Sequence, residues 1–242
     1  MFTDFKNIID FFIRNKTKFS RKNFVEKDKN LIERNIREND YYRDILERFF
    51  KKNLKQNLKI LDIGSKNWFY AKGEFDFFSS FSSNFFLKGV ELDAHRLYSN
   101  FYSRYEVAKY HIKNLKNVEY LADDLLNIEE KFDYITWFLP FITLKPLVFW
   151  GLPKKFFKPE KMLLHAYNLL SKNGQMLIIN QGEKEAQIQK ELLEKLGIKF
   201  LELGKIESEF FEYKNERYGF LIEQKWYKKR DNENVISFYG GG

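Results

Sequence analysis

The stretch LKILDIGSKN, residues Leu58–Asn67, decides the fold of this 242-residue chain. Its apolar run suits a buried strand that ends in Asp62, and Gly64 just beyond lets the backbone turn sharply against a ligand. A second strand pattern, FFLKGVELD at Phe85–Asp93, places Glu91 at its carboxyl end. Open parallel sheets bind nucleotides and related ligands beyond the carboxyl ends of their strands, so the two acids predict an adenosyl ligand.

Strand and helix patterns alternate along the chain from residue 58 onward. Strands are expected at 59–63, 86–92, 118–121, 132–138, 175–180, 199–203 and 218–224, helices at 94–112, 159–170 and 183–196, and a turn at 171–174. This alternation predicts an α/β fold with a seven-stranded, mostly parallel sheet and helices on both faces. The last two strands are joined by a polar stretch, so we expect a hairpin in which one strand is antiparallel.

Residues 1–57 are expected to form a basic, helical amino-terminal extension, followed by a domain over 58–226 and a tail over 227–242. Helical spacing of apolar residues predicts helices over 3–15, with Thr3 as N-cap, and over 31–53. Residues 1–59 hold 16 Lys+Arg against 9 Asp+Glu, and so carry +7 of the formal net charge of +8. Such a region could meet nucleic acid, an anionic membrane surface or an acidic partner, or be an ordinary solvated helical face.

Several kinds of site are disfavoured by composition. The chain has no cysteine, which excludes a disulfide framework and a thiolate metal site. Its three histidines, at 95, 111 and 165, make no ligand pattern, so we predict no metal site and assign no catalytic residue. No apolar stretch approaches the ~20 residues of a membrane span, and the first residues do not read as a secretion signal. A cytoplasmic location is expected by default.

The segments from Leu58 to Gln224 resemble, in order and spacing, the class I S-adenosylmethionine-dependent methyltransferases, whose sheet is Rossmann-like. The resemblance is carried by LDIGSKN, GVELDAH and VEYLADDLLN. In that family the first strand ends in an acid and a glycine-rich loop, the second in an acid that holds the ribose, and the third in an acid beside adenine. The resemblance implies S-adenosylmethionine as cofactor, bound by Asp62, Gly64, Ser65, Glu91, Leu92, Asp123 and Asp124.

Each of these acids could bind the cofactor or have a purely structural role. A carboxylate in the place of Glu91 can accept from both ribose hydroxyls, whereas Asp62 could merely cap or orient the turn. Asp123 or Asp124 could cap a short helix near residue 125, and Asp93 is expected to be the N-cap of the helix over 94–112. The loop itself departs from the family, because Lys66 and Trp68 stand where further glycines are common.

The fourth strand, FDYITWFLPF, ends where many amino-group methyltransferases carry Asn or Asp followed by two prolines and an aromatic residue. The leading polar residue is missing here. All four prolines fall within 140–159, so this aromatic segment is not expected to be one regular helix. Its rings could stack on a flat acceptor or pack on the core. The expected acceptor-binding residues are Trp137, Pro140, Phe141 and Trp150, with Asn180, Gln181 and Gly182 as further candidates.

The function that these features predict is transfer of a methyl group from S-adenosylmethionine to an unidentified acceptor. The altered loop and the missing polar residue favour an alternative, a methyltransferase-like module that has lost catalysis and serves in binding or scaffolding. A nicotinamide-dependent oxidoreductase is disfavoured, because the G-x-G-x-x-G fingerprint is absent after the first strand.

Overall fold

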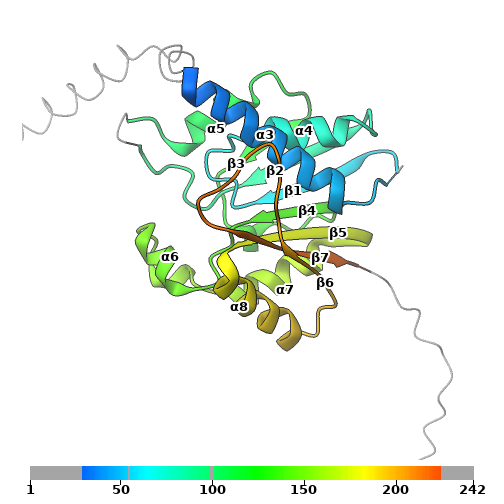
Figure 1. Ribbon diagram of the computed structural model, residues 1–242, viewed down its shortest axis with the longest axis vertical. Helices are drawn as coiled ribbons and strands as arrows, with labels where there is room; N and C mark the ends of the chain where they lie inside the picture. Colours follow the sequence, from blue (N-terminus) through cyan, green and yellow to red (C-terminus); the bar gives the residue numbers. More distant parts are fainter. Residues whose placement is uncertain (1–28, 54, 99–100, 225–242) are drawn as a thin grey trace, which may run out of the picture.

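The computed structural model describes residues 29–53, 55–98 and 101–224 (Figure 1). The helix expected over 3–15 and the tail over 227–242 lie outside the described residues. Within the described part of the chain, no helix has both the length and the apolar character needed to cross a membrane.

One seven-stranded sheet forms the centre of the described structure, with strand order β3-β2-β1-β4-β5-β7-β6. β7 runs antiparallel to its neighbours β5 and β6, and the remaining pairs are parallel, which confirms the mostly parallel sheet and the final hairpin. The strands are β1 (Leu58–Ile63), β2 (Phe85–Val90), β3 (Val118–Leu121), β4 (Phe132–Phe138), β5 (Leu170–Gln181), β6 (Leu201–Lys205) and β7 (Arg217–Glu223). The order reverses between β1 and β4, where sheets of this kind open a ligand-binding crevice.

Helices cover both faces of the sheet (Figure 1), and alternate residues of the central strands belong to the two different hydrophobic clusters. One face, which includes Ile60 and Tyr134, packs against α3 (Lys29–Phe49), α4 (Ala71–Ser79) and α5 (Arg104–Ile112). The other face, which includes Leu61 and Ile135, packs against α7 (Pro159–Leu169) and α8 (Gly182–Lys195). This period of two is what strands buried on both sides require, and it explains the near-continuous apolar runs.

Two expectations for the region around β2 are wrong. The helix expected over 94–112 begins only at Arg104, because Ser103 and Glu106 form a capping box there, with Ser103 Oγ accepting from the Glu106 amide at 3.2 Å. Asp93 therefore caps no helix, and its carboxylate pairs with Arg96 and with Arg104 instead. In addition, the structure contains α4 between β1 and β2, where no helix was predicted.

The turn expected at 171–174 lies inside a longer strand. Leu170 pairs with Phe132 and Gln175 with Tyr134, so the four intervening residues form a bulge in β5, with Asn173 at φ 63°. β3 and β4 have the expected bounds, and the bounds of β1, β2, β6 and β7 differ from the expected ones by no more than two residues.

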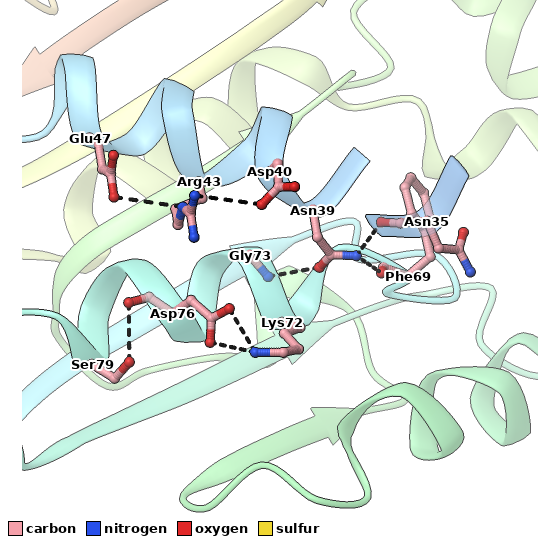
Figure 2. A network of polar contacts seen from close by, with 10 residues as sticks. All are labelled: Asn35, Asn39, Asp40, Arg43, Glu47, Phe69, Lys72, Gly73, Asp76 and Ser79. Atoms are coloured by element: carbon pink, nitrogen blue, oxygen red, sulfur yellow. Dashed lines mark hydrogen bonds and ion pairs between the residues drawn. The ribbon is translucent and has the colours of Figure 1, made fainter. Parts of the chain in front are cut away.

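Asn39 joins α3 to the segment that follows β1. Its side-chain amide donates to the carbonyls of Asn35 (2.7 Å) and Phe69 (2.9 Å), and its side-chain oxygen accepts from the Gly73 amide at 2.7 Å (Figure 2). The two helices approach so closely that a Cβ on Gly73 would lie 2.3 Å from the backbone oxygen of Asn39. Only glycine at position 73 allows this packing.

Gly73→Ala is expected to lower the free energy of unfolding by ~1–3 kcal/mol, because the added methyl group must push α3 away from α4. Helix propensity alone would favour the alanine, so the sign of the change discriminates between the two effects. Urea unfolding followed by circular dichroism measures it. The neighbouring change Lys72→Ala, which removes only an exposed pair with Asp76, is the control and should alter stability by ~0.5 kcal/mol or less. A Gly73→Ala protein as stable as the parent would contradict the close approach.

Candidate functional site

A cavity of about 930 Å³ opens at the carboxyl ends of β1, β2, β3 and β4. Its wall contains most of the residues that the sequence singled out: Gly64, Glu91, Leu92, Asp123, Asp124, Trp137, Pro140, Phe141 and Trp150. Asp62, near the end of β1, and Ser65, within the loop that follows it, are fully buried and are not among the residues that line the cavity. The cavity also takes in side chains that the sequence did not indicate, among them Arg34, Tyr98, Arg104 and Arg217.

The loop after β1 has a left-handed backbone at every second residue. Gly64 has φ 73°, Lys66 has φ 53° and Trp68 has φ 45°. The two side-chain-bearing residues are the ones that stand where the family often has glycine, so the backbone keeps a conformation that favours glycine without having the glycines. Such residues persist only where their surroundings hold them.

Lys66 and Trp68 are each held by several hydrogen bonds. The Lys66 amide donates to Glu91 Oε2 at 2.8 Å, and the Tyr120 hydroxyl donates to the Lys66 carbonyl. The Trp68 ring is fully buried, its Nε1 donates to Glu74 Oε2 at 2.8 Å, and its amide donates to the Ser65 carbonyl at 2.7 Å. Side-chain anchoring thus replaces glycine as the means of fixing this loop.

Glu91 faces the cavity from the end of β2. Its Oε2 accepts from the Lys66 amide and its Oε1 accepts from the Asp93 amide at 2.8 Å, while Arg104 Nη1 lies 3.6 Å from Oε1. A carboxylate oxygen has two acceptor positions, so each oxygen can still accept from one ligand hydroxyl. The two amides and the guanidinium fix the direction of this carboxylate.

Asp123 and Asp124 follow β3 and both line the cavity. Asp124 Oδ1 accepts from the Leu126 amide at 3.0 Å and so caps the short helix η1 (Leu125–Asn127), which is one of the roles that the sequence left open. Asp123 Oδ1 accepts from the Asp124 amide and from Asn127 Nδ2, both at 2.7 Å. These bonds engage one oxygen of each carboxylate and leave the other for a ligand.

Asp62 belongs to a buried network that supports the loop from below. It lies opposite Thr136 in the pairing of β1 with β4, and the Thr136 hydroxyl is 2.9 Å from Asp62 Oδ1 and 2.8 Å from Glu74 Oε1. The Tyr70 hydroxyl donates to Asp62 Oδ2 at 2.8 Å. All these side chains are buried. The Asp62 carboxyl thus joins β1 to β4 through Thr136 and to Tyr70, which follows the loop.

One proton must be held within this network. The Thr136 hydroxyl has a single hydrogen and contacts an oxygen of each carboxyl, so one carboxyl has to donate to it. Burial raises the pKa of Asp62 to about 7, and burial together with the Asp62 charge raises the pKa of Glu74 well above its ordinary value. We assign the proton to Glu74, which then donates to Thr136, while Thr136 and Tyr70 both donate to Asp62.

The segment from Pro140 to Pro159, here called the aromatic segment, closes the cavity. It contains α6 (Leu144–Phe149) and the short helix η2 (Lys154–Phe156), so it is not one regular helix, as predicted. The Trp150 ring centroid lies 4.8 Å from Lys66 Nζ and 5.1 Å from Arg104 Cζ. Trp150 thereby packs on two cationic side chains of the cavity wall.

Arg104 is the wall residue that the sequence gave least reason to expect. Its side chain is buried, and within the described residues its Nε and Nη2 have no hydrogen-bond partner. Burial and the nearby Arg104 charge lower the pKa of Lys66. No sequence signal marked Arg104, since it was expected in the middle of a helix rather than at its first residue.

The remaining candidates are divided between the wall and the protein interior. Gln181 precedes α8 and lines the cavity, whereas Asn180 is fully buried and is not among the lining residues described. His111 lines the cavity, and burial lowers its pKa to about 4, so it is neutral at physiological pH. His95 stacks on Tyr105 instead. Among the described residues no group of His, Asp and Glu has the arrangement of a metal site.

Glu74→Gln tests where the proton lies. A raised pKa in the folded state means that folding retains a proton that the unfolded chain releases, so this contribution is present at low pH and lost as pH rises through the folded pKa. The parent protein should therefore lose stability between pH 5 and pH 8, on the order of 1 kcal/mol per pH unit, relative to Glu74→Gln, whose amide can donate without titrating. Urea unfolding at both pH values measures the difference. Parallel pH profiles for the two proteins would show that Glu74 does not hold the proton.

Comparison with known proteins identifies the fold. No family model matches the sequence, and no curated protein sequence matches it. A SAM-dependent methyltransferase from Aquifex aeolicus is 15% identical, with a TM-score of 0.53 over 88% of this chain and 98% of that one. A methyltransferase from Pyrococcus furiosus is 19% identical, with a TM-score of 0.52 over 79% and 83%. The plantazolicin methyltransferase BpumL, in complex with SAH, is 13% identical, with a TM-score of 0.50 over 90% and 99%.

These similarities extend over most of both chains and agree with the strand order, the antiparallel β7 and the cavity at the switch point. This chain therefore has the Rossmann-like fold of the class I S-adenosylmethionine-dependent methyltransferases.

Proposed function

We propose that the cavity binds S-adenosylmethionine and that the protein transfers its methyl group to an acceptor held beneath the aromatic segment. One observation carries the proposal: Glu91, fixed by two backbone amides at the end of β2, faces the cavity beside a loop whose left-handed residues bring its backbone to the same edge of the sheet. This combination stands at the switch point between β1 and β4, where a nucleotide-like ligand is expected.

Each candidate residue has a role that follows from its position. Glu91 would accept from the ribose hydroxyls, and Asp123, Asp124 and Leu92 would border the adenine. Gly64 has nothing within 4 Å of the place of a side chain, so its backbone is open to the cofactor. Asp62 and Ser65 would act on the cofactor through the shape of the loop, because both side chains are fully buried.

The acceptor would bind beside the cofactor, where the residues that follow β4 border the cavity. Trp137, Pro140 and Phe141 line it from the end of β4, and Trp150 covers it from the aromatic segment. S-adenosylmethionine supplies an activated methyl group when bound, so the protein has to align the acceptor atom for in-line attack and exclude water. Proximity and orientation can provide much of this rate enhancement, and no side chain is assigned as a general base.

Two alternative functions, an inactive binding module and a nicotinamide-dependent enzyme, fit the loop less well. A module that has lost catalysis would have no need of a loop held in this conformation, yet Lys66 and Trp68 are held in place by hydrogen bonds. That arrangement supports a loop that still serves a ligand. A nicotinamide cofactor would need its pyrophosphate to meet a glycine-rich turn, and only one glycine is present here.

Isothermal titration calorimetry on the full chain tests the cofactor directly. We expect saturable heats with S-adenosylmethionine and S-adenosylhomocysteine and none with reduced nicotinamide dinucleotide. The absence of heat with both adenosyl ligands, for folded protein at high concentration, would refute the proposal. Incorporation of a labelled methyl group from S-adenosylmethionine into a metabolite extract would then separate an active enzyme from a binding module.

Glu91→Ala should weaken S-adenosylhomocysteine binding by ~1–3 kcal/mol, because it removes charge-assisted hydrogen bonds to the ribose. Circular dichroism and thermal unfolding establish that the variant is folded. Glu202→Ala serves as the matched control, since that acid lies on the edge strand β6, pairs with Lys190 and does not line the cavity. Equal affinity of Glu91→Ala and the parent would remove Glu91 from the site.

The basic residues 1–59 are a candidate binding surface for a macromolecular partner. We infer that these residues contact nucleic acid, since their excess of seven positive charges complements the charge of a phosphate backbone. A cytoplasmic location is part of the same proposal. Retention on immobilised RNA or DNA should fall steeply with salt concentration. Retention that is absent at low salt would leave these residues as a solvated helical face.

A further inference from the structure

The aromatic segment combines apolar side chains with a single sign of charge. Residues 134–159 contain four lysines, at 145, 154, 155 and 158, and no Asp or Glu. The chain as a whole is nearly balanced outside residues 1–59, so this acid-free stretch is a local feature. Any surface that it forms will favour an anionic partner.

Much of this segment is exposed although it is apolar. On α6, the Phe149 side chain is 87% exposed and Val148 is 46% exposed, and Leu144 is also exposed. The four lysines are exposed beside them in sequence. We call these seven residues the α6 patch: Leu144, Val148, Phe149, Lys145, Lys154, Lys155 and Lys158. An almost fully exposed phenylalanine next to further exposed apolar side chains is a feature of interaction surfaces.

The patch is held in place by the body of the domain. Leu147, on the opposite side of α6, is buried, and its carbonyl accepts from the Leu152 amide at 3.1 Å. Trp150 packs on Lys66 and Arg104. α6 is therefore anchored along its inner side and presents Val148 and Phe149 outward, at the periphery of the domain (Figure 1).

The patch also borders the mouth of the cavity. Phe149, Lys145 and Lys158 line the cavity and are exposed, so they stand where the cavity meets solvent. Val148, Leu144, Lys154 and Lys155 are not among the lining residues and belong to the outer surface alone.

We propose that the α6 patch docks the protein onto an anionic lipid surface, with Phe149 and Val148 entering the headgroup boundary and the four lysines meeting the lipid charges. Interfacial membrane binding needs this pairing of exposed aromatic or aliphatic side chains with lysines, and its strength grows with both the apolar area and the opposite charge. The aromatic side chain distinguishes this surface from a purely electrostatic one, which would serve nucleic acid or an acidic peptide without an exposed phenylalanine and valine.

Docking in this way would turn the mouth of the cavity toward the bilayer. An amphiphilic acceptor is the class of molecule that could enter from there, and this single step rests on the proposed function. The docking itself does not, because it can be measured with neither cofactor nor acceptor present.

Vesicle co-sedimentation of the full chain tests the proposal. The parent should sediment with vesicles of phosphatidylcholine containing phosphatidylglycerol and stay in solution with phosphatidylcholine alone. Because residues 1–59 are themselves basic, the decisive variant leaves all lysines unchanged: Val148→Ser with Leu144→Ser, which alters only outward-facing apolar side chains. We expect it to need about tenfold more anionic lipid for half-maximal sedimentation, as the loss of buried apolar area implies.

Two matched variants complete the experiment. Lys154→Gln with Lys155→Gln should weaken sedimentation with vesicles, and this effect should become smaller as the salt concentration is raised. The weaker sedimentation of the Val148→Ser, Leu144→Ser protein should persist at high salt. Calorimetry with S-adenosylhomocysteine on the same proteins reports the cofactor site separately, so failure of docking and failure of the proposed function are distinguishable. Unchanged sedimentation of the apolar double variant would overturn the proposal, as would an equal loss of binding to duplex DNA in that variant.

Discussion

The buried hydroxyl of Thr136 connects three of the elements around the cavity. It lies on β4, contacts Asp62 on β1 and contacts Glu74 on α4. Two carboxyls removed from water are strongly destabilising unless their oxygens are bonded and their charges reduced. A proton on Glu74, together with donors from Trp68, Tyr70 and Thr136, meets both requirements. The network can exist only if these elements take their observed positions, so it fixes both ends of the loop between β1 and α4.

That fixed loop explains how a site can lose glycines and keep its backbone. A left-handed residue with a side chain is unfavourable by about 1–2 kcal/mol, and this loop contains two of them, Lys66 and Trp68. Trp68 offsets this through burial of its ring and through the bond from its Nε1 to Glu74. Lys66 offsets it through its amide bond to Glu91, which also orients the carboxylate. The residues that most weaken the sequence motif are thus the ones that hold the loop in shape.

This is why the fold was predictable from sequence and much of the site was not. Strand positions follow from apolar runs with a period of two, and Glu91 follows from being the acid at a strand end. The start of α5 depends on a capping box ten residues into a stretch that otherwise reads as helix, and Arg104 enters the cavity wall only because the helix starts there. In the sequence, Asp62 has the position of a ligand-binding acid, near the end of the first strand. Its burial depends on Thr136 and Glu74, which are distant in sequence and carry no local signal.

In the aromatic segment too, the surroundings of each side chain depend on the fold and not on the local sequence. Phe149 and Trp150 are consecutive, yet Phe149 is almost fully exposed whereas Trp150 rests on Lys66 and Arg104 inside the cavity. α6 ends at Phe149 and Gly151 follows with φ 73°, so the chain leaves the helix at Trp150. The wall of the cavity and the outer surface are therefore built from neighbouring residues of one segment.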